Sequence, residues 1–259
     1  MNSSIYCCDF AKFYDVLNSG VDYPAFAEFV CNSIAKFSEI PVFNICELAC
    51  GTGNVAISLA KKGFHVTASD FSADMLSVAE NKSRNERCEI RFILQDMQNT
   101  ALYSKQDAFV CFLDSINYLK DKNSVISTFS RVYDNLSDKG LFIFDVNSKF
   151  KFENIYADNA YILEQDGIVC NWQNFYNKKS HICNFYLSFF ERISENTYKR
   201  FDECHTERMY TIRNLTDYLV FSGFSVEGIF SSFNFKCADE KSDERLFFVA
   251  KKATRKGNV

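Results

Sequence analysis

A glycine-containing loop between an apolar run and a helical pattern constrains this chain most. Val42–Cys46 has the composition of a buried strand, residues 47–54 (ELACGTGN) turn sharply, and Val55–Lys62 has the pattern of a helix closed by a glycine. Gly51 and Gly53 allow positive φ and let a ligand approach the main chain where a Cβ would collide. Because a helix N-terminus presents free amides and partial positive charge, this loop favours a ligand with a carboxylate or phosphate.

An acidic residue follows the loop at the spacing that a ribose-binding carboxylate requires. The run His65–Ser69 predicts a second strand, and Asp70 stands at its end, where its side chain can accept both hydroxyls of a ribose. Residues 51–56 also match the relaxed dinucleotide pattern, in which the strand runs directly into the first glycine. Here Glu47 and three further residues intervene. This spacing favours S-adenosylmethionine and leaves NAD as a weaker alternative.

Strands alternate with helices between residues 42 and 147, which is typical of a parallel sheet wound by crossover helices. Beyond the loop we expect helices over Ala73–Lys82 and Ser124–Leu136, and strands over Glu89–Leu94, Ala108–Leu113 and Leu141–Val146. The carboxyl ends of such strands meet at one edge, where open α/β sheets bind their ligands. The acidic residues expected at this edge are Glu47, Asp70, Asp96, Asp114 and Asp145.

The pattern changes after residue 148 to extended, aromatic-rich segments separated by short polar turns. These segments, over residues 161–164, 168–176, 181–192 and 197–209, predict an inserted antiparallel sheet that covers the ligand edge as a lid. A helix over Leu215–Ser222 and a hairpin of Ser225–Cys237 with Arg245–Lys251 then complete the core sheet. We therefore expect a core formed by residues 1–148 and 211–253, a substrate-side lid over 149–210, and a flexible tail over 254–259.

Composition disfavours several other classes of function. The net charge of −4 and the lack of a basic stripe before the short C-terminal tail argue against nucleic-acid binding. The 11 cysteines include no C-x-x-C pair, so neither a zinc site nor a disulfide framework is expected, and Cys46, Cys111 and Cys183 fit core positions. With no leader and no apolar run of about 20 residues, the chain is expected to be cytoplasmic, without a membrane span, and monomeric or homodimeric.

Four spaced blocks of this chain resemble the motifs of class I S-adenosylmethionine-dependent methyltransferases. They are residues 47–54, Asp70, Gln95-Asp96-Met97 and Leu113-Asp114-Ser115. The resemblance implies an α/β, Rossmann-like, seven-stranded methyltransferase sheet that carries the antiparallel β lid as an insertion. In that family the first acid lies near the methionine amino group, the second holds the ribose, and the third polar position reaches the adenine amino group. The residues implied for cofactor binding are Tyr14, Tyr23, Glu47, Ala49, Gly51, Gly53, Asn54, Asp70, Phe71, Met75, Asp96, Met97, Leu113 and Asp114.

The patterns Asp114-Ser115-x-Asn117-Tyr118 and Phe144-Asp145-Val146-Asn147 closely resemble those of an uncharacterised bacterial branch of the small-molecule methyltransferases. This branch is similar to sugar-amine N,N-dimethyltransferases and glycine N-methyltransferase-like enzymes, in which an N-terminal Tyr-Asp segment folds over the cofactor. Tyr14 and Tyr23 match its two tyrosines, whereas Glu47 departs from the aspartate that many members have. Tyr14 is a candidate for stabilising the sulfonium. The alternative is that Tyr14 only holds a helix on the core.

The expected lid is richest in ionisable groups over residues 200–210 (RFDECHTERMY). On a strand, His205 and Glu207 share one face. They could form a general-base dyad in which the carboxylate orients the ring and raises its basicity; the alternative is a solvated strand face with an ion pair. The candidate contacts to an acceptor are Asn117, Tyr118, Asn147, Trp172 and Arg208, of which Trp172 is either an apolar wall of the site or ordinary core.

Together these features predict an S-adenosylmethionine-dependent methyltransferase that transfers a methyl group to a nitrogen or oxygen of a small metabolite. His205, Glu207 and Tyr14 are its candidate catalytic residues, and no metal is expected to take part. An RNA or protein methyltransferase is the alternative enzyme. A protein that binds S-adenosylmethionine without catalysis is the alternative from another class.

Overall fold

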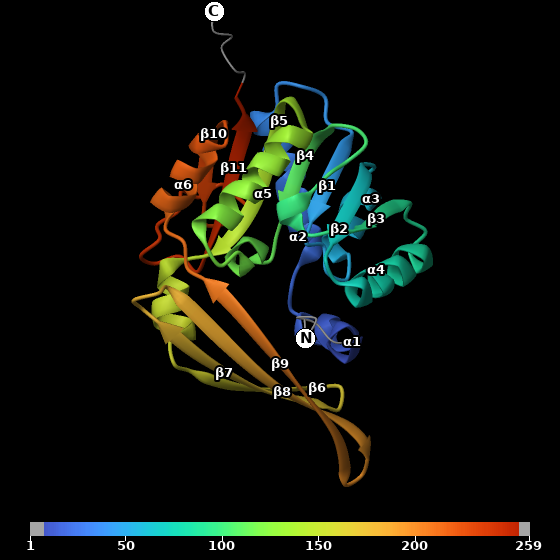
Figure 1. Cartoon of the computed structure of the whole chain (residues 1–259). Coiled ribbons are helices and arrows are strands. Elements are labelled where there is room, and N and C mark those ends of the chain that lie inside the picture. The colour runs from blue at the N-terminus through green and yellow to red at the C-terminus, as the bar shows by residue number, and fades with distance from the viewer. Residues whose placement is uncertain (1–7, 254–259) are drawn as a thin grey trace, which may run out of the picture.

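A seven-stranded sheet forms the centre of the molecule. The computed structural model describes residues 8–253, so the expected tail over 254–259 lies outside the described residues. The sheet has the order β10-β11-β5-β4-β1-β2-β3, and β11 runs antiparallel to both of its neighbours (Figure 1). The expected α/β sheet with a closing hairpin is therefore confirmed. Its strands are β1 (Asn44–Leu48), β2 (His65–Asp70), β3 (Ile90–Leu94), β4 (Gln106–Cys111), β5 (Leu136–Asn147), β10 (Phe224–Phe230) and β11 (Arg245–Lys252).

Helices cover both faces of this sheet, and each face has its own apolar core. One core includes residues of α5 and α6, and the other includes residues of α2, α3 and α4. Cys46 and Cys111 are buried in the first core, as expected. The helices are α1 (Cys8–Leu17), α2 (Tyr23–Phe37), α3 (Asn54–Lys61), α4 (Ala73–Asn85), α5 (Lys122–Asn135) and α6 (Ile212–Phe221), with the short turns η1 (Met97–Asn99), η2 (Ser115–Tyr118) and η3 (Lys151–Tyr156).

Several elements differ in their bounds from the prediction: β5 begins at Leu136, α4 ends at Asn85 and α6 begins at Ile212, and α5 and β10 also differ. Helix α5 begins earlier than expected because the carboxylate of Asp121 caps it, accepting a hydrogen bond from the backbone N–H of Ser124 at 2.9 Å. Strand β10 ends at Phe230 instead of continuing to residue 237. The chain turns after it because Phe233 and Phe235 pack against Phe26 and Phe29 of α2, respectively.

The segment after β5 forms the expected inserted antiparallel sheet. It has four strands, β6 (Ala160–Gln165), β7 (Ile168–Asn177), β8 (Ile182–Ser194) and β9 (Thr197–Arg208), in sequence order. Its apolar inner face shares a third core with α1 and η3, and this core contains Cys183 as expected. Figure 1 shows this sheet beyond one end of the seven-stranded sheet, with α1 on the same side. The insertion and α1 therefore enclose the carboxyl edge of the parallel strands.

Gly53, at the start of α3, should be sensitive to a methyl group for two separable reasons. Its φ is +79°, and an added Cβ would lie 2.9 Å from the Cβ of Ala79 in α4. Gly63 has a φ of +95° but open space around it. We expect Gly53→Ala to lower the free energy of unfolding by about 2–4 kcal/mol, from backbone strain and overpacking, and Gly63→Ala by only about 1–2 kcal/mol. Urea unfolding measures the loss of free energy of unfolding in both variants. Equal losses would show that α4 shifts to accommodate the added methyl group at no energetic cost.

Candidate active site

One cavity of about 430 Å³ lies between the carboxyl edge of the central sheet, α1 and the inner face of the inserted sheet. The part near the glycine loop, here called the cofactor end, is lined by Tyr14, Ala49, Gly51, Asp70, Phe71, Met75, Asp96, Met97, Leu113 and Asp114. The part near the inserted sheet, here called the acceptor end, is lined by Tyr118, Lys151, Tyr156, Trp172, Phe185, His205, Glu207 and Arg245. Ten of the sequence-predicted cofactor residues thus border a single cavity together with four of the predicted acceptor and catalytic residues.

Asp70 organises the cofactor end from the last position of β2. One carboxylate oxygen accepts a hydrogen bond from the backbone N–H of Gly51, and the other accepts one from Ser72, both at 2.8 Å. Burial raises the pKa of Asp70, while these amides counteract the shift. Because each carboxylate oxygen has more than one lone pair, the side chain can hold the loop and still accept bonds from a ligand.

Glu47 is a buried carboxylate with one unpartnered oxygen, although the backbone N–H of Ala56 also interacts with the group. It lies near the end of β1 with 3% of its surface exposed, and its Oε2 atom has no hydrogen-bond partner among the described residues. Burial raises the pKa of Glu47 to about 8. The side chain borders a small hollow next to the cofactor end, which it shares with Tyr14 and Tyr23. An unsatisfied acid beside a hollow is a position that a cationic group of a ligand would satisfy.

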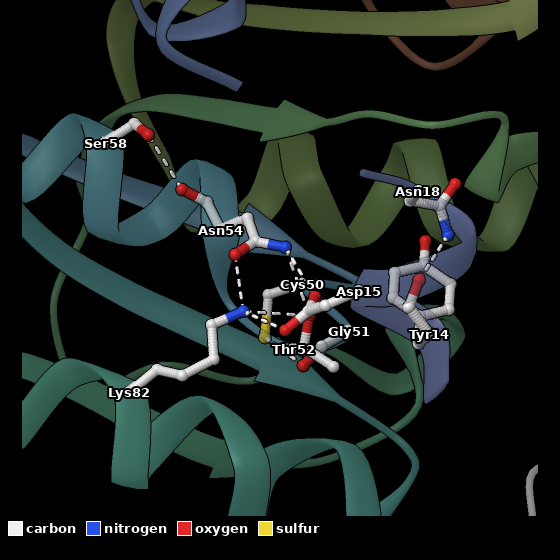
Figure 2. A network of polar contacts seen from close by, with 9 residues as sticks. All are labelled: Tyr14, Asp15, Asn18, Cys50, Gly51, Thr52, Asn54, Ser58 and Lys82. Carbon is white, nitrogen blue, oxygen red and sulfur yellow. Dashed lines mark hydrogen bonds and ion pairs between the residues drawn. The ribbon is translucent and has the colours of Figure 1, made fainter. Parts of the chain in front are cut away.

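The two glycines of the loop have different roles. Gly51, with a φ of +52°, faces the ring of Tyr14, and a Cβ there would lie 3.9 Å from that ring. Gly53 instead faces α4, as described above, and Asn54 directs its amide towards Asp15 and Lys82 (Figure 2). We expected both Gly53 and Asn54 to contact a cofactor. The structure gives Gly53 a packing role, and it uses the side chain of Asn54 to hold neighbouring helices.

Asp15 connects α1 to the loop and to α4 (Figure 2). One of its carboxylate oxygens accepts hydrogen bonds from Thr52 at 2.6 Å and Asn54 at 2.8 Å, and the other pairs with Lys82 at 2.7 Å. Burial works against ionisation of Asp15, but these donors outweigh it and lower its pKa. The network keeps Tyr14, the preceding residue of α1, over the cofactor end.

Tyr23, the second predicted tyrosine, begins α2 and borders only the small hollow and an outer groove. Burial raises the pKa of Tyr23 to about 12, so its hydroxyl stays protonated at neutral pH. It faces the same hollow as Glu47. Tyr23 and Tyr14 therefore approach the cofactor end from two different helices.

At the acceptor end, His205 and Glu207 share a face of β9 but have different partners. Nδ1 of His205 lies 3.4 Å from the hydroxyl of Tyr118, and its ring lies 5.2 Å from that of Phe10. Glu207 accepts a hydrogen bond from Nδ2 of Asn147 at 3.1 Å. Burial lowers the pKa of His205 to about 4, so our expectation that the carboxylate raises its basicity is wrong. The alternative of a solvated face is also wrong, because both side chains are buried.

A partly buried charge cluster borders the acceptor end. The guanidinium of Arg245 pairs with Asp145 at 2.6 Å and with Asp114 at 2.8 Å. Although burial opposes its charge, the two aspartates raise the pKa of Arg245. Lys151 donates to Oδ1 of Asn147 at 3.0 Å. Asp114, which we expected to bind the cofactor, borders the cavity, and its Oδ1 atom pairs with Arg245.

The predicted acceptor contacts fall into three groups. Tyr118 and Trp172 line the cavity, whereas Asn147 lies behind Glu207. Asn117 is fully buried and uses its amide to join Arg208 O and Asn147 N, both at 2.9 Å, so it crosslinks elements instead of facing the cavity. Arg208 lies on the opposite face of β9 and donates to Lys120 O at 3.3 Å. For Asn117 and Arg208 the expectation of an acceptor contact is wrong.

Four residues of the acceptor end were not predicted from the sequence, namely Lys151, Tyr156, Phe185 and Arg245. Lys151 and Tyr156 lie on η3, which has a π-helical turn, and Arg245 begins β11 opposite Asn147. A cation at the start of a strand carries no local signal of burial; only the pairing of β11 with β5 places it beside Asp145. Within residues 8–253 the structure contains no cluster of acidic, cysteine and histidine side chains that could hold a metal ion. In the same range no helix is long and apolar enough to span a membrane.

Known proteins share this architecture. Residues 45–140 match the family described as a methyltransferase domain. A protein of Geobacillus sp. (strain WCH70) assigned to the methyltransferases is 35% identical over 94% of this chain and 98% of its own length. An S-adenosylmethionine-dependent methyltransferase from Clostridium acetobutylicum ATCC 824 is 32% identical, with a TM-score of 0.86 over 95% of this chain and 98% of its own. The sugar N-methyltransferase KedS8 from Streptoalloteichus sp. has a TM-score of 0.76 at 17% identity over 98% of both chains.

The chain belongs to the class I S-adenosylmethionine-dependent methyltransferases. The residues at the cofactor end fit S-adenosylmethionine, because the unpartnered Oε2 of Glu47 suits its ammonium group and Asp70 has lone pairs left for the ribose hydroxyls. Asp96 and Met97 lie further along the same end, where the adenine would be held. When bound, the cofactor supplies a methyl group carried by a positively charged sulfur.

Proposed function

We propose that this enzyme transfers the methyl group to a nitrogen or oxygen of a small metabolite bound at the acceptor end. The shape of the cavity is the main support for this proposal. The acceptor end is a recess between η3 and β9 that is continuous with the cofactor end. A recess of this kind suits a small molecule. The seven-stranded sheet alone would leave the same edge open to a macromolecule, and the inserted sheet and α1 cover it.

Methyl transfer mainly requires alignment and exclusion of water, with a base only where the acceptor carries a proton that must leave. In this proposal Tyr14 places its ring beside the sulfonium, Trp172 and Phe185 form the apolar wall, and His205 and Glu207 face the acceptor. Fold-level support comes from the sugar N-methyltransferase named above and from an amino pentose methyltransferase with a TM-score of 0.71. The acidic net charge of −4 disfavours RNA as the acceptor.

The test is a transfer experiment with S-adenosylmethionine labelled in the methyl group and a cell extract of the host that retains its small molecules, RNA and protein. We expect label in one or a few small molecules and none in RNA or protein. Label in RNA or protein would establish the alternative enzyme. Tight binding of S-adenosylmethionine with no transfer to any component would establish a binding protein without catalysis.

A further inference from the structure

We propose that the acceptor is an amine and that Glu207 is the catalytic residue that binds its ammonium form and takes up its proton. This inference rests on the proposed function and names the substrate class for the same site. In it His205 is a neutral positioning residue, and the carboxylate acts directly on the acceptor.

Glu207 is held firmly at the cavity wall. It projects from β9 into the acceptor end with 4% of its surface exposed, and Asn147 donates to its Oε2 atom. Asn147 is itself fixed, because its backbone N–H donates to Asn117 and its Oδ1 atom accepts from Lys151. Hydrogen bonds from residues outside the cavity fix the orientation of the carboxylate and leave its cavity-facing side open to a ligand.

The buried and partly buried charged groups around Glu207 include more acids than bases. The carboxyl groups are Asp114, Asp145 and Glu207, and the cations are Lys151 and Arg245. Two cations act on the charge of Glu207. Lys151, which contacts Asn147, is the stronger of the two, whereas Arg245 pairs directly with both aspartates. The other ionisable groups that face this cluster are His205, Tyr118, Tyr156, Cys183 and the exposed Glu244.

This imbalance leaves one negative charge that a proton or a cation must compensate. In agreement, burial and the nearby charge of Asp114 raise the pKa of Glu207, which favours a bound proton. Burial and Arg245 lower the pKa of Lys151. Lys151 is therefore less able to balance the negative charge of Glu207. An ammonium group at the cavity wall would supply the missing positive charge, whereas an alcohol or a carboxylate would not.

His205 is unsuited to hold this proton. Its ring lies among Phe10 and Tyr118, and burial keeps it neutral at pH 7. In the proposed step the N–H bond of the bound ammonium breaks, its proton passes to the carboxylate of Glu207, and the electron pair stays on the nitrogen. That pair then forms the bond to the methyl carbon as the bond from this carbon to sulfur breaks. The electrons of the broken bond stay on sulfur as a neutral thioether, and the positive charge passes to the nitrogen. The proton on Glu207 leaves to solvent, so each turnover releases one proton.

The experiment combines the labelled transfer with Glu207→Gln, which keeps the shape and the acceptor oxygen that Asn147 requires. The matched control is Glu203→Gln, because Glu203 is buried on the same strand and face but does not border the cavity. We expect the label of the wild type on nitrogen and at least a 100-fold loss of product in Glu207→Gln. S-adenosylhomocysteine affinity, measured by calorimetry, should stay within about threefold in both variants. The residual rate of Glu207→Gln should rise tenfold per pH unit towards the pKa of the free amine, since the proton must then leave in solvent.

Label on oxygen or carbon would overturn the amine assignment while leaving the proposed function intact. A Glu207→Gln rate within a few-fold of wild type, or an unchanged pH profile, would overturn the role of Glu207. Absence of transfer to any component would contradict the proposed function and this inference together.

Thermal unfolding provides a readout that does not depend on turnover. Glu207→Gln should have a higher melting temperature than wild type at pH 8 and the same melting temperature at pH 5. The reason is that the raised pKa of Glu207 destabilises the wild type only as the pH rises. A lower melting temperature at pH 8 would contradict the excess of negative charge.

Discussion

Replacing Asp70 by alanine should weaken the binding of S-adenosylmethionine and S-adenosylhomocysteine by about 100-fold or more. The carboxylate has two tasks: it accepts the backbone N–H groups of Gly51 and Ser72, and it offers its remaining lone pairs to the ribose hydroxyls. Alanine leaves both amides and both hydroxyls without their acceptor, and hydrogen bonds to charged groups each contribute about 1.5–3 kcal/mol. Isothermal titration calorimetry measures the loss directly.

Two variants separate the tasks of Asp70. Asp70→Asn keeps one acceptor oxygen and the shape of the side chain, so it should lose less affinity than alanine does. Asp74→Ala, in the first turn of α4, removes a nearby carboxylate that does not border the cavity and should bind the cofactor like wild type. An affinity for Asp70→Ala within threefold of wild type would mean that the ribose lies elsewhere.

The affinity for S-adenosylmethionine should rise more than tenfold between pH 5.5 and 7.5 because of Glu47. Burial raises the pKa of this group to about 8, so Glu47 is protonated over most of that range. The ammonium of the cofactor stabilises the ionised form, and binding must therefore expel a proton at lower pH. Calorimetry in buffers of different ionisation enthalpy would detect that proton as well as the change in affinity.

Glu47→Gln should bind more weakly at pH 7.5 and show almost no dependence on pH. It should also be the more stable protein at pH 8. Below pH 4.5, the ordinary pKa of a glutamate, Glu47 is protonated in both the folded and the unfolded wild type. As the pH rises from 4.5 to about 8, the unfolded state loses this proton more readily, so the free energy of unfolding of the wild type falls. Glutamine cannot ionise and avoids that loss. An affinity of the wild type that is flat between pH 5.5 and 7.5 would show that Glu47 does not meet the ammonium.

Most of the fold could be predicted because its signals are local. The glycine loop, the alternation of strands and helices, and the turn-separated aromatic segments are all patterns within about 15 residues. The exceptions have long-range causes. Strand β10 ends early because Phe233 and Phe235 find partners on α2, which lies nearly 200 residues away along the chain. No pattern within the segment itself predicts such a contact.

The residues of the candidate site also divide into those that a local pattern predicts and those that depend on long-range contacts. Asp70 and Gly51 follow a spacing that their ligand dictates, and both lie where that spacing placed them. Gly53 follows the same spacing but is required by the packing of α4 on the loop. The acceptor end depends on β5, β9, η3 and β11 meeting in space, so Arg245 and Lys151 escaped notice and Asn117 was misplaced. Sequence spacing can identify groups on one loop, whereas a site assembled from four elements requires the structure.

The central claim is that the cofactor is held by Asp70 in the cavity and by Glu47 at the adjoining hollow, with its reactive end directed towards Glu207. A crystal structure of the protein with S-adenosylhomocysteine tests it most directly. We expect the ribose hydroxyls within hydrogen-bond distance of Asp70, the ammonium beside Glu47, and the sulfur facing the acceptor end. A nucleoside bound away from Asp70, or a sulfur that points away from the inserted sheet, would contradict the account.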